Sequence, residues 1–89
     1  MKLTEEVTIV NQLGLHARAA TKLVQLCQQF SACIELTQEG KSADASSVLA
    51  LLMLASSKGK TVQISAEGDD AEAALTAVTA LIRNGFDES

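Results

Sequence analysis

The sequence predicts a two-layer α/β (α+β) fold, in which three helices cover one face of a four-stranded sheet. Seven segments are recognised from the spacing of their apolar residues, and their order along the chain is strand, helix, two strands, helix, strand, helix. No internal repeat or linker interrupts this order. Elements with one apolar face each pair into two layers, so we expect the other sheet face to be in water.

The four strands follow from alternation of apolar and polar residues. We expect them over residues 3–10, 32–37, 41–43 and 61–67. The second and third are joined at Glu39-Gly40, because glycine accepts the positive φ of a tight turn. The third strand begins with a charged residue, which is typical of a sheet edge.

The first helix is expected over residues 17–30, where apolar residues recur at helical spacing without a Gly or Pro. The second is expected over residues 48–54, capped by Ser47 or Ser46. Its seven residues are apolar on all sides, and a short surface helix cannot bury every side. We therefore expect some of its side chains to form an exposed contact surface, with Leu51 and Leu54 in the core.

The third helix is expected to follow residues 68–70 and to end at Asn84-Gly85, a typical C-terminal stop. Asp69 and Glu72 have the spacing of a capping box. The last residues, 86–89, are expected to form a short acidic tail.

Composition narrows the possible functions. The chain has 89 residues, which suits a single domain over residues 1–89, and 47% of them are hydrophobic, enough for a core. A net charge of −4 and only two aromatic residues argue against a nucleic-acid partner. No apolar run has membrane-spanning length, and the N-terminus has no signal-peptide pattern. Cys27 and Cys33 have no metal-ligand spacing, so we expect reduced, partly buried thiols in a cytosolic protein, with no metal and no cofactor.

The stretch Gly14-Leu15-His16-Ala17-Arg18-Ala19-Ala20 contains the only histidine and lies where a strand pattern gives way to a helical one. The first N–H groups of a helix lack partners and carry partial positive charge, so they bind anions. A neutral imidazole has a basic nitrogen free for attack, and histidine is largely neutral at cytosolic pH. We therefore interpret His16 as a phosphoryl acceptor rather than a histidine that merely caps a helix.

Arg18 lies in the first turn of this helix, where a cation is mildly unfavourable beside the positive end. That placement suggests a role as a phosphate clamp, since a guanidinium matches phosphate oxygens better than an ammonium does. The alternative is a solvated first-turn cation. We assign the backbone N–H groups of Ala17 and Arg18 to the phosphoryl oxygens.

The motif Gly14-Leu15-His16-Ala17-Arg18 resembles the active centre of the HPr-like phosphocarriers of the bacterial phosphotransferase system. The element order is that family's, and Ser47, followed by an apolar helix and Lys58-Gly59-Lys60, resembles its second landmark. Residues 47–54 and the ending Asn84-Gly85-Phe86-Asp87 look more like the nitrogen-related branch, often called NPr. One residue departs from the pattern: Ala19 stands where the family usually has proline, and alanine is compatible with a helix.

The resemblance implies an open-faced α/β sandwich with an antiparallel sheet in the order 1-4-2-3. It implies that Nδ1 of His16 accepts a phosphoryl group from phospho-enzyme I, which takes it from phosphoenolpyruvate, and passes it to a IIA-type protein. In the nitrogen branch the outcome is regulation. It further implies a regulatory role for Ser47, phosphorylated by a serine kinase in some lineages, beside its role as helix cap. The resemblance also implies that Val48, Leu49 and Leu52 dock on partners, and we expect Thr21, Gln25 and Gln28 to border them.

Three functions can be compared at this stage. The first is a cytoplasmic, monomeric phosphocarrier, which is an intermediate in phosphoryl transfer rather than a free-standing enzyme. The second is a regulatory binding module of the same fold that docks through Val48, Leu49 and Leu52 and never carries phosphate; Ala19 keeps this alternative open. A conventional enzyme is disfavoured, because one histidine in 89 residues leaves little from which to build a site.

Overall fold

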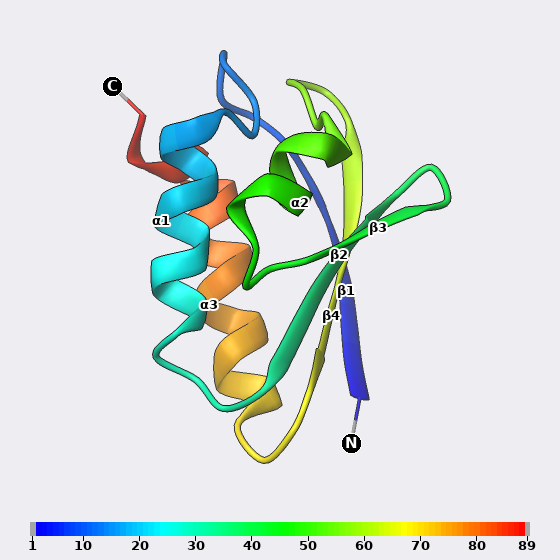
Figure 1. The fold of residues 1–89 in the computed structure, drawn as a ribbon, viewed down its shortest axis with the longest axis vertical. Helices are drawn as coiled ribbons and strands as arrows, with labels where there is room; N and C mark the ends of the chain where they lie inside the picture. The colour runs from blue at the N-terminus through cyan, green and yellow to red at the C-terminus, as the bar shows by residue number, and fades with distance from the viewer. Residues whose placement is uncertain (1, 89) are drawn as a thin grey trace.

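In the computed structural model, which describes residues 2–88, four strands form one antiparallel sheet with three helices against one of its faces (Figure 1). The expected domain, residues 1–89, includes Met1 and Ser89, which lie outside the described residues. The sheet order is β1-β4-β2-β3, as expected. The strands are β1 (Lys2–Thr8), β2 (Cys33–Gln38), β3 (Lys41–Asp44) and β4 (Thr61–Glu67).

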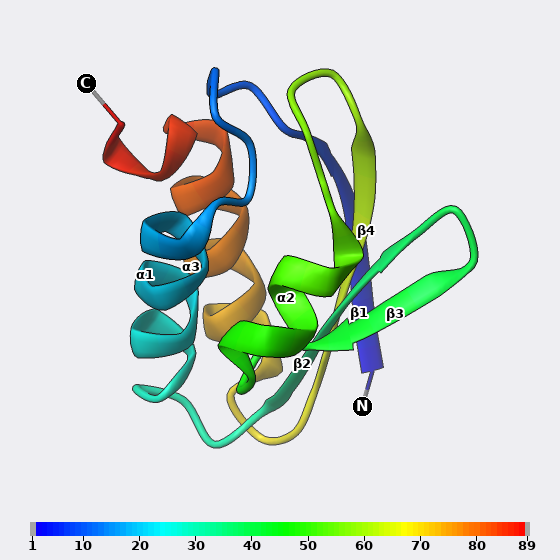
Figure 2. The ribbon, with the colours of Figure 1, turned by 45° about the horizontal axis from the view of Figure 1, so that its top comes forward.

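The helices are α1 (Ala17–Cys27), α2 (Val48–Leu54) and α3 (Ala71–Arg83), followed by the short 3-10 helix η1 (Gly85–Asp87). Figure 2 shows the three α-helices on the same side of the sheet, with α2 near the β2–β3 hairpin. None of the helices within residues 2–88 is both long and apolar enough to cross a bilayer.

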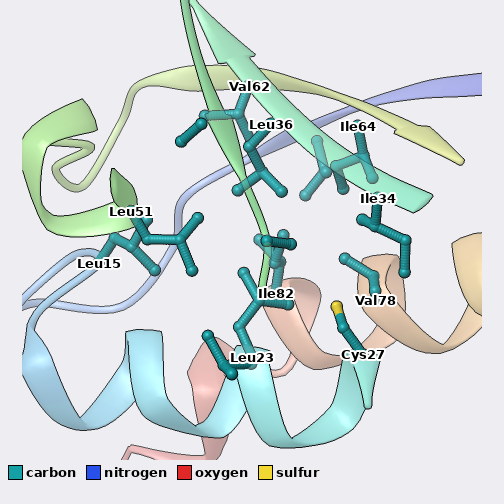
Figure 3. Packing of buried hydrophobic residues seen from close by; sticks show 14 of the residues in the cluster. Leu15, Leu23, Cys27, Ile34, Leu36, Leu51, Val62, Ile64, Val78 and Ile82 are labelled. Atoms are coloured by element: carbon teal, nitrogen blue, oxygen red, sulfur yellow. The ribbon is translucent and has the colours of Figure 1, made fainter. Parts of the chain in front are cut away.

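Strand register places alternate side chains in the core. Val7 pairs with Val62, and Leu36 pairs with Ile64, and all four are buried beneath the helices. The residues between them face water, which confirms the expected wet face of the sheet. Figure 3 shows side chains of all three helices meeting these strand residues. The fully buried side chains of this core include Leu23, Leu51, Val78, Ile82, Leu36, Val62 and Ile64.

Two elements end earlier than the sequence predicts. The first strand ends at Thr8 rather than at residue 10, although Ile9 still donates its N–H to the Lys60 carbonyl at 2.9 Å. Helix α1 ends at Cys27 rather than at residue 30. Beyond it, Gln29 and Phe30 donate to carbonyl oxygens three residues back, both at 3.1 Å, so the chain tightens out of the α-helix.

The expected capping box of α3 is wrong. The N-cap is Asp70, one residue later than expected, and its side chain makes no capping hydrogen bond. Its carboxylate instead accepts the backbone N–H groups of Ser31 and Ala32, at 2.9 and 2.8 Å, and the Ser31 hydroxyl at 3.2 Å. The Asp70 carboxylate therefore binds the distant N–H groups of residues 31–32 and does not cap its own helix.

The expected acidic tail is also corrected for its described residues. Phe86 is buried in the core with a φ of 56°, and the Lys22 ammonium donates to its carbonyl oxygen at 3.1 Å. Both views show this C-terminal segment folded back beside the start of α1 (Figures 1 and 2). Ser89 lies outside the described residues. Burial of a large aromatic side chain explains why the segment packs rather than extending into solvent.

The two cysteines occupy different environments, and both are free thiols. Cys27 is buried on α1, where loss of hydration and the nearby Asp44 carboxylate raise its pKa to about 11. Its thiol is therefore protonated and unreactive at neutral pH. Cys33 is exposed at the start of β2, so the expectation of two partly buried thiols is wrong for Cys33.

Candidate functional site

The loop before α1 is folded by its own hydrogen bonds. Gly14 adopts a φ of +64° and donates its N–H to the Asn11 carbonyl at 3.2 Å. The Asn11 side-chain amide returns a hydrogen bond to the Gly14 carbonyl at 2.8 Å. Leu15 is buried, and its N–H reaches the Ser56 carbonyl at 2.9 Å. These hydrogen bonds therefore fix the position of the residue after Leu15 at the start of α1.

That residue is His16, which is the N-cap of α1 with extended backbone angles (φ −79°, ψ 178°). The first intrahelical bond runs from the N–H of Ala20 to the His16 carbonyl, at 2.8 Å. The N–H groups of residues 17–19 precede this bond, so they have no acceptor inside the helix. The first turn contains no acidic side chain to neutralise them. The expected junction of one histidine with free helix amides is therefore present.

The imidazole of His16 is half-buried, with 26% of its side chain exposed. Its Nε2 atom lies 3.4 Å from Oε1 of Glu88. The side chain makes no capping hydrogen bond back to α1. The Nε2 edge of the ring therefore contacts the protein, and part of the ring remains accessible to solvent.

The Glu88 carboxylate is held in turn by the loop. Oε1 accepts a hydrogen bond from the Asn11 side-chain amide at 2.9 Å. This bond, followed by the N–H of Leu13, the charge of His16 and the N–H of Gln12, holds the pKa of the Glu88 carboxyl below its usual range. Glu88 is therefore ionised at neutral pH.

Arg18 shares a surface hollow of about 450 Å³ with His16. Lys22 and the C-terminal residues Phe86 and Glu88 also line this hollow. Arg18 is exposed, so its guanidinium has room to reach an anion beside the imidazole. The structure thus brings together the residues that the sequence assigned to the phosphoryl group, His16, Ala17 and Arg18. Within residues 2–88, no three His, Cys, Asp or Glu side chains gather as a metal ion would require.

Helix α2 has one buried and one exposed side. Leu51 and Leu54 are buried, as expected, and Val48 is half-buried. Leu49, Leu52 and Met53 are 68%, 37% and 70% exposed. Helices α1 and α2 contact each other, and the α1 residues expected to border the surface are all exposed. Those residues are Thr21, Gln25 and Gln28.

The sequence predicts Val48, Leu49 and Leu52 as contact residues but not two further exposed apolar side chains. Met53 follows Leu52 on α2, and Leu13, 66% exposed, lies in the loop before His16. The signal for Met53 was present, because a seven-residue helix that is apolar all round must expose several side chains. Leu13 gave no such signal, because a single apolar loop residue is as often buried as exposed.

Ser47 caps α2: its hydroxyl oxygen accepts the N–H of Ala50 at 3.1 Å, and its backbone is extended. Ser46 does not cap the helix. Its N–H donates to the Asp44 carboxylate at 2.8 Å. The Ser46 hydroxyl, and after it this N–H, lower the pKa of the Asp44 carboxyl. Of the two serines expected as caps, Ser47 is therefore the N-cap of α2.

Glu88 and Asn11 were not assigned to the site from the sequence. Asn11 looked like an ordinary turn residue, and Glu88 lies 72 positions after His16, so no local pattern joins them. The one available signal was Phe86, one of only two aromatic residues in the chain. A lone aromatic near a chain end predicts that the end packs against the core, and the residues after it follow.

The fold and the site together define a small helix-on-sheet protein whose only histidine stands at a helix N-terminus. A family model described as "PTS HPr component phosphorylation site" matches residues 3–84. The chain therefore belongs to the HPr family of phosphocarrier proteins.

Individual relatives are similar to this chain over nearly its whole length. The chain is 53% identical over 88 residues to the phosphocarrier protein NPr of Shewanella violacea, covering 99% of this chain and 97% of the relative. It is 49% identical over 89 residues to phosphocarrier protein NPr of Escherichia coli K12, covering 99% of both. The crystal structure of HPr-C-His from Thermoanaerobacter tengcongensis superimposes with a TM-score of 0.92 at 38% identity, covering 98% of each chain.

Proposed function

We propose that this protein carries a phosphoryl group on Nδ1 of His16, accepting it from phospho-enzyme I and passing it to a IIA-type protein. Its high identity to two proteins named NPr supports a place in the nitrogen-related branch of the phosphotransferase system. The observation that carries the proposal is the position of His16, partly exposed at the N-cap of α1 beside three N–H groups without helical acceptors.

The chemistry follows from that position. Nδ1 attacks phosphorus and forms an N–P bond while the bond to the donor breaks, and the donor atom keeps the electron pair. The N–H groups of Ala17 and Arg18 and the Arg18 guanidinium meet the oxygens of the arriving dianion. The backbone donors are already in place at the start of α1, so little reorganisation is needed there during transfer. The protein is both reactant and product of each half-step, and this distinguishes it from a free-standing enzyme.

Partners would dock on the exposed apolar side of α2, formed by Val48, Leu49, Leu52 and Met53 and bordered by the exposed residues of α1. Successive transfer to different partners needs a small interface that is released quickly. We further propose that the carrier is a cytoplasmic monomer, since each partner must reach the same face of α2. Sedimentation of the purified chain would test the monomer.

The decisive experiment is labelling. The purified chain is mixed with radiolabelled phosphoenolpyruvate and either nitrogen-type or sugar-type enzyme I, and the label is followed by its acid lability. His16→Ala should remove all label while circular dichroism and thermal unfolding stay close to those of the parent chain. Faster labelling by the nitrogen-type enzyme would support that branch. Stable label on the His16→Ala variant would refute the assignment.

The same mixture tests the alternative of a pure binding module. If the native chain takes no label but still binds enzyme I or a IIA-type protein, and if His16→Ala binds equally well, the module is supported instead. The exposed surface of α2 would then be the functional part of the molecule.

Ser47 is proposed as a regulatory phosphosite. Its hydroxyl lies at the start of α2, directly before the exposed apolar residues, so a phosphate there would place negative charge within the docking surface. Incubation with ATP and a serine kinase should label the native chain and leave Ser47→Ala unlabelled. Labelling retained by Ser47→Ala and lost by Ser46→Ala would move the site to Ser46.

A further inference from the structure

We propose that Glu88 is a positioning residue for transfer at His16: its carboxylate holds the ring proton on Nε2 and meets the positive charge that the ring gains on phosphorylation. This inference rests on the proposed function and adds a residue to it from the far end of the chain.

The contact itself is specific to one ring edge. Oε1 of Glu88 lies 3.4 Å from Nε2 of His16, and both side chains are largely shielded, with 20% and 26% exposed. A carboxylate can only accept a proton at this position, so it favours the tautomer with hydrogen on Nε2. In that tautomer the lone pair is on Nδ1, which is the nucleophile in the proposed transfer.

Glu88 is fixed rather than dangling. The Asn11 amide donates to the same Oε1 atom at 2.9 Å, and Asn11 is itself buried in the loop that delivers His16. The Glu88 N–H donates to the Gly85 carbonyl at 3.0 Å. Buried Phe86, with its carbonyl bound by Lys22, anchors the preceding residues against α1. The carboxylate is thus tied both to the loop before His16 and to the helix after it.

The charge balance of the step explains why a carboxylate is useful there. When Nδ1 forms the N–P bond, the Nε2 proton stays on the ring, and the donor atom leaves with the electron pair of the broken bond. The ring therefore becomes a phosphorylated imidazolium, whose positive charge is delocalised over both nitrogens. A carboxylate beside Nε2 stabilises this cation more than the neutral ring, as the buried aspartate does for the histidine of a Ser-His-Asp triad.

An unrelated structural role makes different predictions. If Glu88 only ties the C-terminal segment to Asn11, then Glu88→Gln should behave as the parent, because the amide oxygen still accepts from Asn11. If the charge acts on His16, Glu88→Gln should slow transfer although the chain folds as before. Glu35→Gln is the matched control, since it removes one carboxylate from the exposed side of the sheet, in strand β2.

The experiment has two readouts. Nitrogen-15 NMR of the His16 ring above pH 8 should show the Nε2–H tautomer in the parent chain, and Glu88→Ala should raise the Nδ1–H population. Single-turnover transfer from phospho-enzyme I should slow about fivefold in Glu88→Gln, the size expected for a partly hydrated charge pair, and stay unchanged in Glu35→Gln.

The inference is overturned if the parent ring is mainly Nδ1–H, or if Glu88→Gln transfers at the parental rate. The tautomer is measured without any phosphoryl donor, so it separates the two proposals. A parent chain that takes no label but whose tautomer responds to Glu88→Ala would refute the phosphocarrier function and leave the His16–Glu88 contact established. If the parent chain takes label, and the Glu88 variants match it in ring tautomer and transfer rate, only the role of Glu88 is refuted.

Discussion

Leu15 donates its backbone N–H to the carbonyl oxygen of Ser56 at 2.9 Å, which joins the loop before α1 to the segment after α2. The same carbonyl leaves no room at the preceding residue. A Cβ atom added to Gly14 would lie 2.5 Å from the Ser56 oxygen and 2.9 Å from Cα of Ser57. Glycine is therefore required at position 14 both by its positive φ and by this backbone contact, and the position of His16 depends on it.

Gly14→Ala should consequently displace the loop. We expect the free energy of unfolding to fall by more than about 2 kcal/mol, since the strain of a left-handed residue, about 1–2 kcal/mol, adds to the contact with Ser56. The matched control is Gly40→Ala, where φ is +83° but no atom lies within 4 Å of the new Cβ. The difference between the unfolding free energies of the two variants, measured in urea, gives the cost of the contact with Ser56. Equal losses in the two variants would show that the loop moves freely away from Ser56.

Two leucines of α2, one exposed and one buried, should separate stability from binding. Leu51→Ala removes a fully buried side chain and should cost about 2–5 kcal/mol of unfolding free energy. Leu49→Ala removes a side chain that is 68% exposed and should change stability by less than about 0.5 kcal/mol. Titration calorimetry against enzyme I should show the reverse order, with binding weakened by Leu49→Ala. Unchanged affinity in that variant would remove Leu49 from the docking surface.

Features set by local chemistry were predictable from the sequence. Helix α2 and strand β4 begin and end at the expected residues, Ser47 caps α2, and Gly85 follows α3 with a φ of +68°. Each depends on residues within one or two turns, where capping and glycine conformations leave a clear pattern. The junction at His16 belongs to this group, because a strand pattern followed by a helical one defines it.

Features set by contacts between distant segments were not predictable. Asp70 looked like a helix-start acid, but the unpaired N–H groups of residues 31–32 take its carboxylate. Glu88 looked like part of a solvated tail, but burial of Phe86 brings it to Asn11 and His16. In both cases the deciding partner lies more than 35 residues away, as the separations of 38 and 77 for two of these bonds show.

The Asp70 contact predicts a specific acid sensitivity. Its hydrogen bonds, above all that from the Ser31 N–H, hold the pKa of the Asp70 carboxyl below its usual range. The unfolded chain therefore binds this proton first, so the stabilisation is complete above pH about 4 and is lost as pH falls through the lowered folded pKa. Unfolding free energy measured from pH 2 to 7 should fall less steeply in Asp70→Ala below pH about 4 than in the parent.

At neutral pH the same variant should be less stable than Asp69→Ala. The neighbouring Asp69 is exposed, and removing it deletes an equal charge but none of the bonds to residues 31–32. If both variants unfold at the same urea concentration, the bonds of Asp70 contribute nothing to the fold.

Arg18 should be irreplaceable by lysine. A guanidinium can present two parallel N–H groups to phosphate oxygens, and an ammonium cannot. Arg18→Lys should slow phosphoryl transfer by about tenfold, the loss expected for one charge-assisted hydrogen bond, and leave thermal unfolding unchanged. The control is Arg83→Lys, because Arg83 pairs with Glu5 at 2.6 Å and does not line the hollow that His16 and Arg18 share. This variant should transfer at the parental rate. Parental rates in both variants would favour a merely solvated Arg18.

Ala19→Pro would restore the residue that the resembling family usually carries, and its outcome follows from the helix start. The N–H of Ala19 precedes the first intrahelical bond, so proline removes no helical hydrogen bond there. Fixing φ in the unfolded chain should raise the unfolding free energy by about 0.4–1 kcal/mol. Ala19 is buried, so a loss of stability instead would show that the core beside α1 has no room for the proline ring.

The same variant tests whether the Ala19 N–H binds the phosphoryl oxygens. If it does, phosphoryl transfer should slow in Ala19→Pro even though the variant is more stable, and single-turnover kinetics on the same samples would separate the two effects.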